Sequence, residues 1–138
     1  MVATVNGHPA VEAASMRPDP LHTSFVAGLM WLDPSFVRGQ LHPGFLDPGG
    51  QWQAPNFLTP TLQGQVVAAF NSGFRLNASH GGYYSEGRIV HPLRDGAASL
   101  VLGKDGTARV GSWNRDVRMG PEIASVRQNL ALLVDDGQ

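Results

Sequence analysis

Cysteine is absent from this 138-residue sequence, and charged residues are scarce. Without a thiol, the chain cannot form disulfides, a thiolate nucleophile, an iron–sulfur cluster or a zinc site with Cys ligands. Only 15% of the residues are Asp, Glu, Lys or Arg, and the net charge at pH 7 is -1. Proteins that bind nucleic acids or anionic membrane surfaces usually carry a basic excess. We therefore expect no nucleic-acid partner.

Long apolar runs are missing as well. No run reaches the roughly 18 residues that a membrane-spanning helix requires, so we expect no membrane span. Residues 1–20 do not show a basic segment followed by an apolar one, so no signal peptide is predicted there. Hydrophobic residues nevertheless make up 42% of the sequence, which is too many for a disordered chain of low net charge.

Glycine and proline are plentiful, with 17 and 10 residues, and they mark turns between short strand-like segments. Asn6-Gly7, Glu86-Gly87 and Lys104-Asp105-Gly106 each lie between two such segments, which predicts three β-hairpins. The flanking segments are residues 2–5, 10–14, 83–85, 88–90, 98–102 and 107–112. In the last pair, alternation predicts a buried face made of Leu100, Leu102, Ala108 and Val110.

Two further apolar runs have strand character. Residues 24–32 predict a strand that is buried at its centre, with residues 37–42 as its hairpin partner. Residues 65–70 predict another strand, which ends at Asn71. Residues 130–134 predict an apolar strand near the end of the sequence, and an exposed edge there would pair with missing residues or with a second copy.

Helical signals are few. Residues 61–65 predict a single helical turn, and residues 121–129 predict a short helix with Pro121 in its first turn. Residues 43–60, rich in Pro and Gly, predict a long loop of the kind that often covers a site. Together these features predict an α+β fold of mainly antiparallel hairpins with one or two short helices.

Familiar catalytic motifs are not found. The sequence contains no HExxH, P-loop, GxGxxG, GxSxG or EF-hand motif. Its five histidines are scattered without the spacing of metal ligands. We therefore predict neither a metal nor a cofactor.

Residues whose side chains could bind a ligand or take part in catalysis are most frequent between Phe70 and Ala98. Asn71 offers a side-chain amide, and the N–H groups of Ser72 and Gly73 follow it at a predicted strand end, where binding loops are common. The pair Tyr83-Tyr84 follows two glycines and could stack on sugar rings. A tight turn and ordinary core packing explain the same residues equally well, so this pattern alone does not choose between site and scaffold.

Four segments in a fixed order carry a resemblance to a known family. They are Asn71-Ser72-Gly73-Phe74, Gly87-Arg88-Ile89-Val90, the hairpin 100–110 around Asp105-Gly106, and Leu133-Val134-Asp135-Asp136-Gly137. The chain resembles the phosphodiester glycosidase family, in particular its actinobacterial members, over residues 20–138. Ser72 departs from the pattern, because the family often has Gly at that position.

The resemblance has a consequence for domain organisation. The family domain continues beyond the last of these segments into a second half with an Arg-containing motif and an Asp-Gly-Gly motif. The resemblance therefore implies that residues 1–138 form a single, partial domain. It also implies that this chain alone shows no hydrolysis.

The implied activity is the hydrolysis of a sugar 1-phosphodiester in exported or cell-surface glycans, which implies an extracytoplasmic location. The phosphate is a weak base, so the main demands are holding its negative charge and stabilising an oxocarbenium-like sugar. Arginine forks and backbone N–H groups meet the first demand. Arg94 is the foremost candidate for this role, followed by Arg115 and Arg127.

Candidate site residues follow from this chemistry. The only carboxylates in the dense segment are Glu86 and Asp95, and they form no convincing catalytic pair. The predicted catalytic residues are Asn71, Glu86, Arg94 and Asp95. The predicted substrate-binding residues are Ser72, Gly73, Tyr83, Tyr84, Arg127, Gln128 and Asn129.

A second hypothesis belongs to another class of protein. The chain is then a non-catalytic, β-rich module that binds glycan or cell wall through aromatic side chains. Its candidate residues are Trp52, Tyr83, Tyr84 and Trp113.

Overall fold

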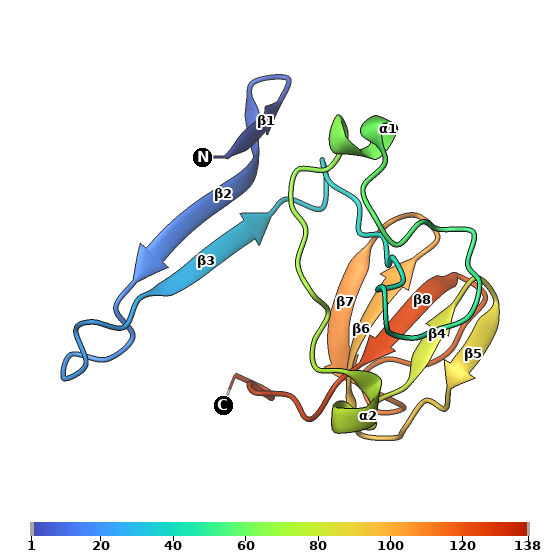
Figure 1. Cartoon of the computed structure of the whole chain (residues 1–138). Coiled ribbons are helices and arrows are strands. Elements are labelled where there is room, and N and C mark those ends of the chain that lie inside the picture. Colours follow the sequence, from blue (N-terminus) through green and yellow to red (C-terminus); the bar gives the residue numbers. More distant parts are fainter. Residues whose placement is uncertain (1, 138) are drawn as a thin grey trace. The chain divides into compact units, whose positions relative to one another are not determined.

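The computed structural model describes residues 2–137, and the chain divides into two compact units, Met1–Val37 and Arg38–Gln138 (Figure 1). Within the described residues there are eight strands, all paired antiparallel in two sheets, and two helices of four residues each. The predicted α+β class, dominated by antiparallel hairpins with two short helices, is confirmed. None of the helices in residues 2–137 is long and apolar enough to cross a bilayer.

The first unit is a three-stranded sheet of order β1-β2-β3, built from β1 (Ala3–Val5), β2 (His8–Met16) and β3 (Ala27–Leu32). Asn6 and Gly7 have φ angles of 50° and 80°, so both residues of the turn lie in the left-handed region. Val5 pairs directly with His8 across this turn. The hairpin predicted at Asn6-Gly7 is confirmed, and its loop has only two residues.

The strand β3 differs from its prediction in two ways. Its partner is β2, and residues 37–42 form no strand. Leu29, Met30 and Trp31 are each about half exposed, at 51%, 53% and 51%. The predicted burial of this run is therefore wrong, because within the described part of this unit no helix or second sheet covers the strand.

The second unit contains a five-stranded sheet of order β5-β4-β8-β6-β7. Its strands are β4 (Tyr83–Ser85), β5 (Arg88–His91), β6 (Ala98–Gly103), β7 (Ala108–Ser112) and β8 (Ile123–Gln128). The hairpins predicted around Glu86-Gly87 and Asp105-Gly106 are both confirmed as β4–β5 and β6–β7.

The central strand β8 occupies the segment for which a short helix was predicted, and that prediction is wrong. This strand pairs with β4 on one side and with β6 on the other. The polar residues Ser125, Arg127 and Gln128 are all buried in it. Pairing on both edges overrides the local preference of a polar segment that begins with proline.

The core of this unit lies on one face of the sheet. It is formed by Val101, Trp113, Ile123 and Val126, with Tyr84, Leu93 and Val117 packed against it. The buried face predicted for the β6–β7 hairpin is therefore mostly wrong, since Val101 is buried and Val110 is 70% exposed. Leu102 is buried on the opposite face, where a Cβ added to Gly39 would lie 2.8 Å from its Cδ2 atom.

The helices are α1 (Pro60–Gln63) and α2 (Leu76–Ser79). The turn α1 confirms the single helical turn predicted at 61–65, and the Thr59 hydroxyl accepts a hydrogen bond from Leu62 N at 3.3 Å at its start. Residues 43–59 contain no helix or strand, as the predicted long loop requires.

Two predicted strands do not form. Residues 65–70 and 130–134 have no strand structure, and most of their larger apolar side chains are exposed. These runs have the composition of strands but pair with no strand among the described residues. The structure therefore shows no strand edge at residues 130–134, and pairing between copies stays a prediction.

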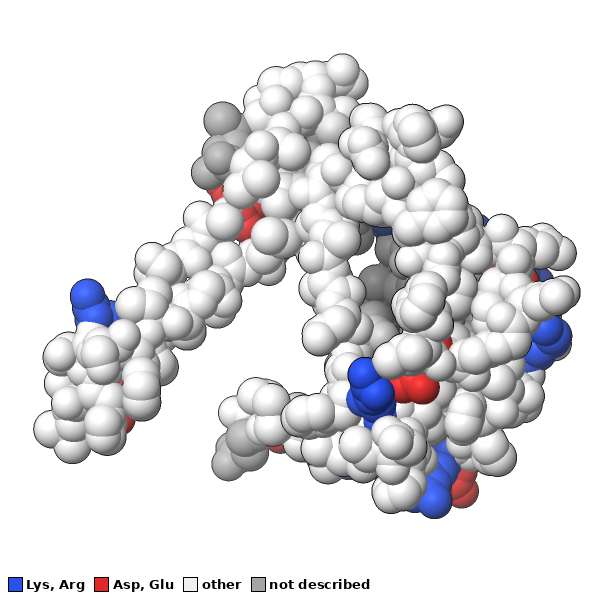
Figure 2. Space-filling view, viewed as in Figure 1, with Lys and Arg blue, Asp and Glu red and all other residues white. Residues whose placement is uncertain are grey.

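Charged side chains are thinly spread. On the face drawn in Figure 2, the blue and red atoms form small separate groups, and most of the surface is white. This matches the low charged fraction of the sequence, 15%.

Candidate functional site

A buried arginine near the end of the central strand is the most unusual feature of the second unit. Arg127 is only 6% exposed, and it pairs directly with Tyr83 of β4, so both side chains lie on the same face of the sheet. Its guanidinium donates to the carbonyl oxygens of Phe74 and Gln128. No carboxylate in residues 2–137 lies within ion-pairing distance of it. Within the described residues, the guanidinium is thus hydrogen-bonded to backbone carbonyls and not to a carboxylate.

The hydroxyl of Tyr83 is also buried. The residue is 3% exposed, and its Oη atom has no hydrogen-bond partner among the described residues. Burial raises the pKa of Tyr83 to about 12, although the positive charge of Arg127 acts in the opposite direction. A buried hydroxyl without a partner costs about 1–3 kcal/mol of stability.

Asn129 follows directly after β8 and carries a second buried polar atom. Its Oδ1 atom finds no donor within the part of the chain that is described. The side chain lies against Gly73, where an added Cβ would be 2.6 Å from the Asn129 Nδ2 atom. Gly73 also has a φ of 124°, so its backbone conformation and this close approach both require glycine.

These groups are connected through the segment Gly73-Phe74. Gly73 contacts Asn129, and the next carbonyl, that of Phe74, accepts from Arg127. We call Gly73, Tyr83, Arg127 and Asn129 the Arg127 cluster.

Asp47 belongs beside this cluster, although its sequence pattern predicts no role in a site. Its Oδ2 atom accepts a hydrogen bond from Leu76 N at 3.0 Å, at the start of α2. Burial lowers the pKa of Arg127, and the negative charge of Asp47 opposes that effect. In the sequence, Asp47 stands in Asp47-Pro48-Gly49-Gly50, where the turn residues gave no sign of a role beyond the loop.

The cluster offers a cation, a hydroxyl and an amide oxygen at one place. A guanidinium holds phosphate or carboxylate oxygens, while the hydroxyl and the amide oxygen suit sugar hydroxyls. A metal would need other groups, and residues 2–137 contain no set of three His, Asp or Glu side chains that could hold one.

Gln128 was predicted to bind substrate, but its side chain is wholly engaged within the fold. Its Oε1 atom accepts from Gly82 N at 3.0 Å and from Arg94 N at 2.7 Å. Its Nε2 atom donates to Arg94 O and Ser99 Oγ, each at 3.0 Å. All four of its hydrogen-bonding positions are used, so Gln128 fixes the segments around the sheet.

Glu86 was a predicted catalytic carboxylate, and it holds a loop in place. Its Oε1 atom accepts from Gln53 N at 3.0 Å and from Ala54 N at 2.8 Å. These two hydrogen bonds lower the pKa of Glu86. The carboxylate also lies 3.6 Å from Arg88, and its negative charge helps to raise the pKa of Tyr83.

The side chains of the other predicted residues form no hydrogen bond with the cluster within residues 2–137. Arg94 is exposed, and only its backbone is engaged, with Gln128. The Oδ1 atom of Asp95 accepts from Asn114 Nδ2 at 2.6 Å. Asn71 is exposed and makes no hydrogen bond with the described residues, while its neighbour Ser72 is partly buried. The structure therefore brings together four of the predicted residues and separates the predicted catalytic set.

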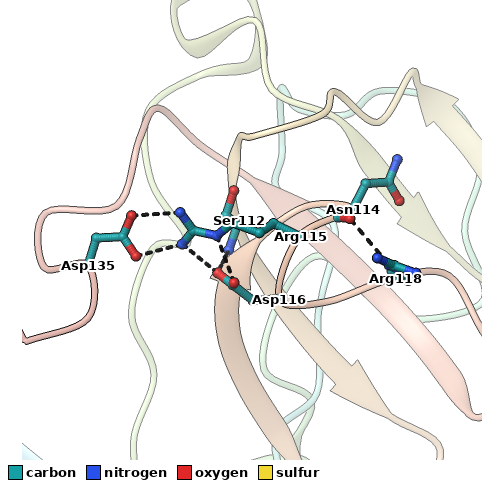
Figure 3. A network of polar contacts seen from close by, with 6 residues as sticks. All are labelled: Ser112, Asn114, Arg115, Asp116, Arg118 and Asp135. Atoms are coloured by element: carbon teal, nitrogen blue, oxygen red, sulfur yellow. Dashed lines mark hydrogen bonds and ion pairs between the residues drawn. The ribbon is translucent and has the colours of Figure 1, made fainter.

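Arg115, the second candidate for holding phosphate, is fully occupied by carboxylates (Figure 3). It donates to both carboxylate oxygens of Asp116, at 2.7 and 2.8 Å, and to Asp135, at 2.8 Å for one of two bonds. These bonds raise the pKa of Arg115 and lower the pKa of Asp116 to about 2. This network ties the end of the chain to the turn after β7.

The four aromatic residues of the binding-module hypothesis form no exposed platform. Trp113 is 4% exposed and belongs to the core, and Tyr84 packs against that core. Trp52 meets Tyr83 edge to face at 5.5 Å, and Arg88 lies 4.3 Å from the centre of its ring.

Comparison with known proteins gives no relative: no family model, curated protein or solved structure matches the chain.

Proposed function

We propose that the unit Arg38–Gln138 binds a carbohydrate phosphodiester at the Arg127 cluster and takes part in its hydrolysis. The observation that carries this proposal is the buried guanidinium of Arg127, which forms no ion pair with a carboxylate in residues 2–137. A phosphodiester supplies the missing negative charge. The order of the segments that resemble the phosphodiester glycosidase family supports the same substrate class, in exported or cell-surface glycans.

The reaction breaks the bond between the anomeric carbon and the bridging phosphate oxygen. Water adds its hydroxyl to the anomeric carbon, and the phosphomonoester leaves with the electron pair of the broken bond. The guanidinium of Arg127 holds the phosphate oxygens, on which negative charge grows as the bond breaks. This charge is stabilised more strongly in the transition state than in the bound substrate.

The two buried polar atoms orient the sugar. The Tyr83 hydroxyl donates to or accepts from a sugar hydroxyl, and the Oδ1 atom of Asn129 accepts from one. In this proposal Asp47, whose negative charge acts on Arg127, takes the proton of the attacking water. It takes the place of Glu86 and Asp95, the carboxylates predicted from the sequence.

The test compares two arginines in the same sheet unit. Binding of a panel of sugar 1-phosphodiesters is followed by calorimetry, and free sugar is measured in the same samples. Arg127→Lys should weaken binding at least tenfold, about 1.4 kcal/mol, because lysine cannot reproduce the fork. The exposed Arg94→Lys serves as the matched control and should bind as the wild type does.

Each outcome is decisive for one part of the proposal. Equal affinities for the two variants would contradict the role of Arg127. Binding without release of sugar would support the binding role, and release of sugar would contradict the expectation that this chain alone shows no hydrolysis.

A further inference from the structure

The long loop of the second unit encloses a hollow that the Arg127 cluster does not include. Its volume is about 230 Å³. It is lined by Pro43, Gly44, Phe45, Gly49, Gly50, Trp52, Ala54, Pro55 and Asn56. All of these residues come from one continuous segment, 43–56, which we call the hollow loop.

The hollow loop is irregular but firmly attached. Glu86 accepts from the N–H groups of Gln53 and Ala54, and Arg88 donates to Gln51 O at 2.7 Å. At its far end, the carbonyl of Pro55 lies 2.8 Å from the Nδ1 atom of His42.

Bonds within the hollow loop add to this attachment. The indole N–H of Trp52 donates to Gly49 O, and Gly44 N donates to Asp47 O, each at 2.7 Å. The shape of the hollow is thus fixed by the chain itself, which lowers the entropic cost of binding a ligand.

The lining has the chemistry that binds a sugar ring. Phe45 is 87% exposed and offers an aromatic face to the C–H side of a pyranose. Asn56 is exposed and offers both a donor and an acceptor for hydroxyl groups. Gly49 and Gly50 have φ angles of 74° and 81°, and an added Cβ at either meets nothing within 4 Å, so there is free space beside them.

The size of the hollow limits the ligand. Pockets for drug-sized molecules occupy about 300–1,000 Å³. A hollow of about 230 Å³ is smaller than this range and suits a single ring. A longer glycan would have to leave it through the open side.

The hollow and the Arg127 cluster share a wall. Trp52 lines the hollow, and its ring packs against Tyr83 with the ring centres 5.5 Å apart. Tyr83 in turn pairs directly with Arg127 across the two strands. The side chains of Trp52 and Tyr83 therefore connect the hollow to the Arg127 cluster.

We propose that the hollow is a pyranose subsite, which holds one sugar ring of the phosphodiester while Arg127 holds its phosphate. This inference rests on the proposed function, and it makes Phe45 and Asn56 the residues that determine sugar specificity. Phe45 stacks on the sugar ring, and the side-chain amide of Asn56 forms hydrogen bonds with the hydroxyl groups of the sugar.

The experiment separates the two halves of the ligand. Methyl glycosides of several pyranoses and inorganic phosphate are titrated separately into the labelled chain, and amide shifts are followed by NMR. Glycosides should shift the signals of the hollow loop, and phosphate should shift those around Arg127. Phe45→Ala should weaken glycoside binding about tenfold and leave phosphate binding unchanged.

The matched control is Phe57→Ala. Phe57 is 64% exposed and follows directly after the hollow loop, but it does not line the hollow. Its loss should change neither titration. Asn56→Ala should reduce the differences in affinity among the pyranoses.

The subsite is overturned if Phe45→Ala and Phe57→Ala behave alike, or if glycosides leave the hollow loop unshifted. Glycoside binding in the hollow without any phosphate response at Arg127 would instead contradict the proposed function. The two failures are therefore distinguishable.

Discussion

Tyr83 carries a hydroxyl group in a place where no atom of the described chain bonds it. Its neighbour Arg127 has a buried charge that only backbone carbonyls contact. Arrangements of this kind reduce the stability of the folded chain and are typical of sites that meet a ligand.

The first prediction concerns that hydroxyl group. Tyr83→Phe removes the unpartnered Oη atom and leaves the ring packing intact, so the free energy of unfolding should stay the same or rise by about 1 kcal/mol. Phosphodiester binding should weaken at the same time. Chemical denaturation and calorimetry on one preparation measure both, and a clear loss of stability would show that the hydroxyl has a partner within the fold.

The second prediction concerns Gly73. Its φ of 124° and its contact with Asn129 should both penalise a side chain, so Gly73→Ala should destabilise the unit by about 1–3 kcal/mol. Gly96 is the matched control, because its φ is 76° but an added Cβ meets nothing within 4 Å. If urea unfolding shows the same loss of unfolding free energy for Gly73→Ala and Gly96→Ala, the contact with Asn129 contributes nothing to the penalty.

At the scale of elements, the hairpins could be predicted and the sheet order could not. The dipeptides Asn6-Gly7 and Glu86-Gly87 predict their turns without reference to the rest of the chain, because these residues tolerate left-handed backbone angles. The strand β8 gives no such local signal. Its strand character comes from the edges of β4 and β6, which are far from it in the sequence.

The Arg127 cluster could also be predicted only in part, because it depends on contacts between distant parts of the sequence. Gly73, Tyr83, Arg127 and Asn129 were all named from the sequence, but Arg94 was preferred over Arg127. Nothing local distinguishes two arginines, and only the placement of β8 in the middle of the sheet buries one of them. Asp47 was missed because a carboxylate in a Pro- and Gly-rich loop has the same local pattern as a turn residue.

The third prediction belongs to the hollow loop. Glu86 holds it through Gln53 N and Ala54 N, so Glu86→Ala should free this segment while the sheet persists. Limited proteolysis should then cut within residues 50–56 faster than in the wild type. Glu122→Ala provides the control, and equal cleavage of the two variants would contradict the role of Glu86.

At the scale of the whole molecule, few charges are present and several of them serve the fold. Arg115 links Asp116 to Asp135, Glu86 and Arg88 hold the hollow loop, and Asp105 caps its own turn. Arg127 differs from Arg115 because its charge contacts no carboxylate among the described residues.

The fourth prediction concerns the stability of the folded chain at acidic pH. Bonds from Arg115 lower the pKa of Asp116 to about 2, against about 3.9 in an unfolded chain. A lowered folded-state pKa gives stability that is present above pH 4 and is lost as the pH falls towards 2. Wild type should therefore exceed Asp116→Asn in melting temperature at pH 7.

The control for this prediction is Arg115→Gln, which removes the largest cause of the lowered pKa of Asp116. The difference between wild type and Asp116→Asn should close as the pH falls from about 4 to 2. With Arg115→Gln as the background, the aspartate substitution should have a smaller effect, because only the hydrogen bond from Ser112 N still lowers the pKa of Asp116. A difference that persists at pH 2 would show that the ion pair is not its source.

The central claim is that Arg127 holds a phosphate group. The most direct test is calorimetric titration of a sugar 1-phosphodiester into wild type, Arg127→Lys and Arg94→Lys. The account predicts binding to wild type and Arg94→Lys with equal affinity, and at least tenfold weaker binding to Arg127→Lys. Equal binding by all three proteins, or none by the wild type, would contradict it.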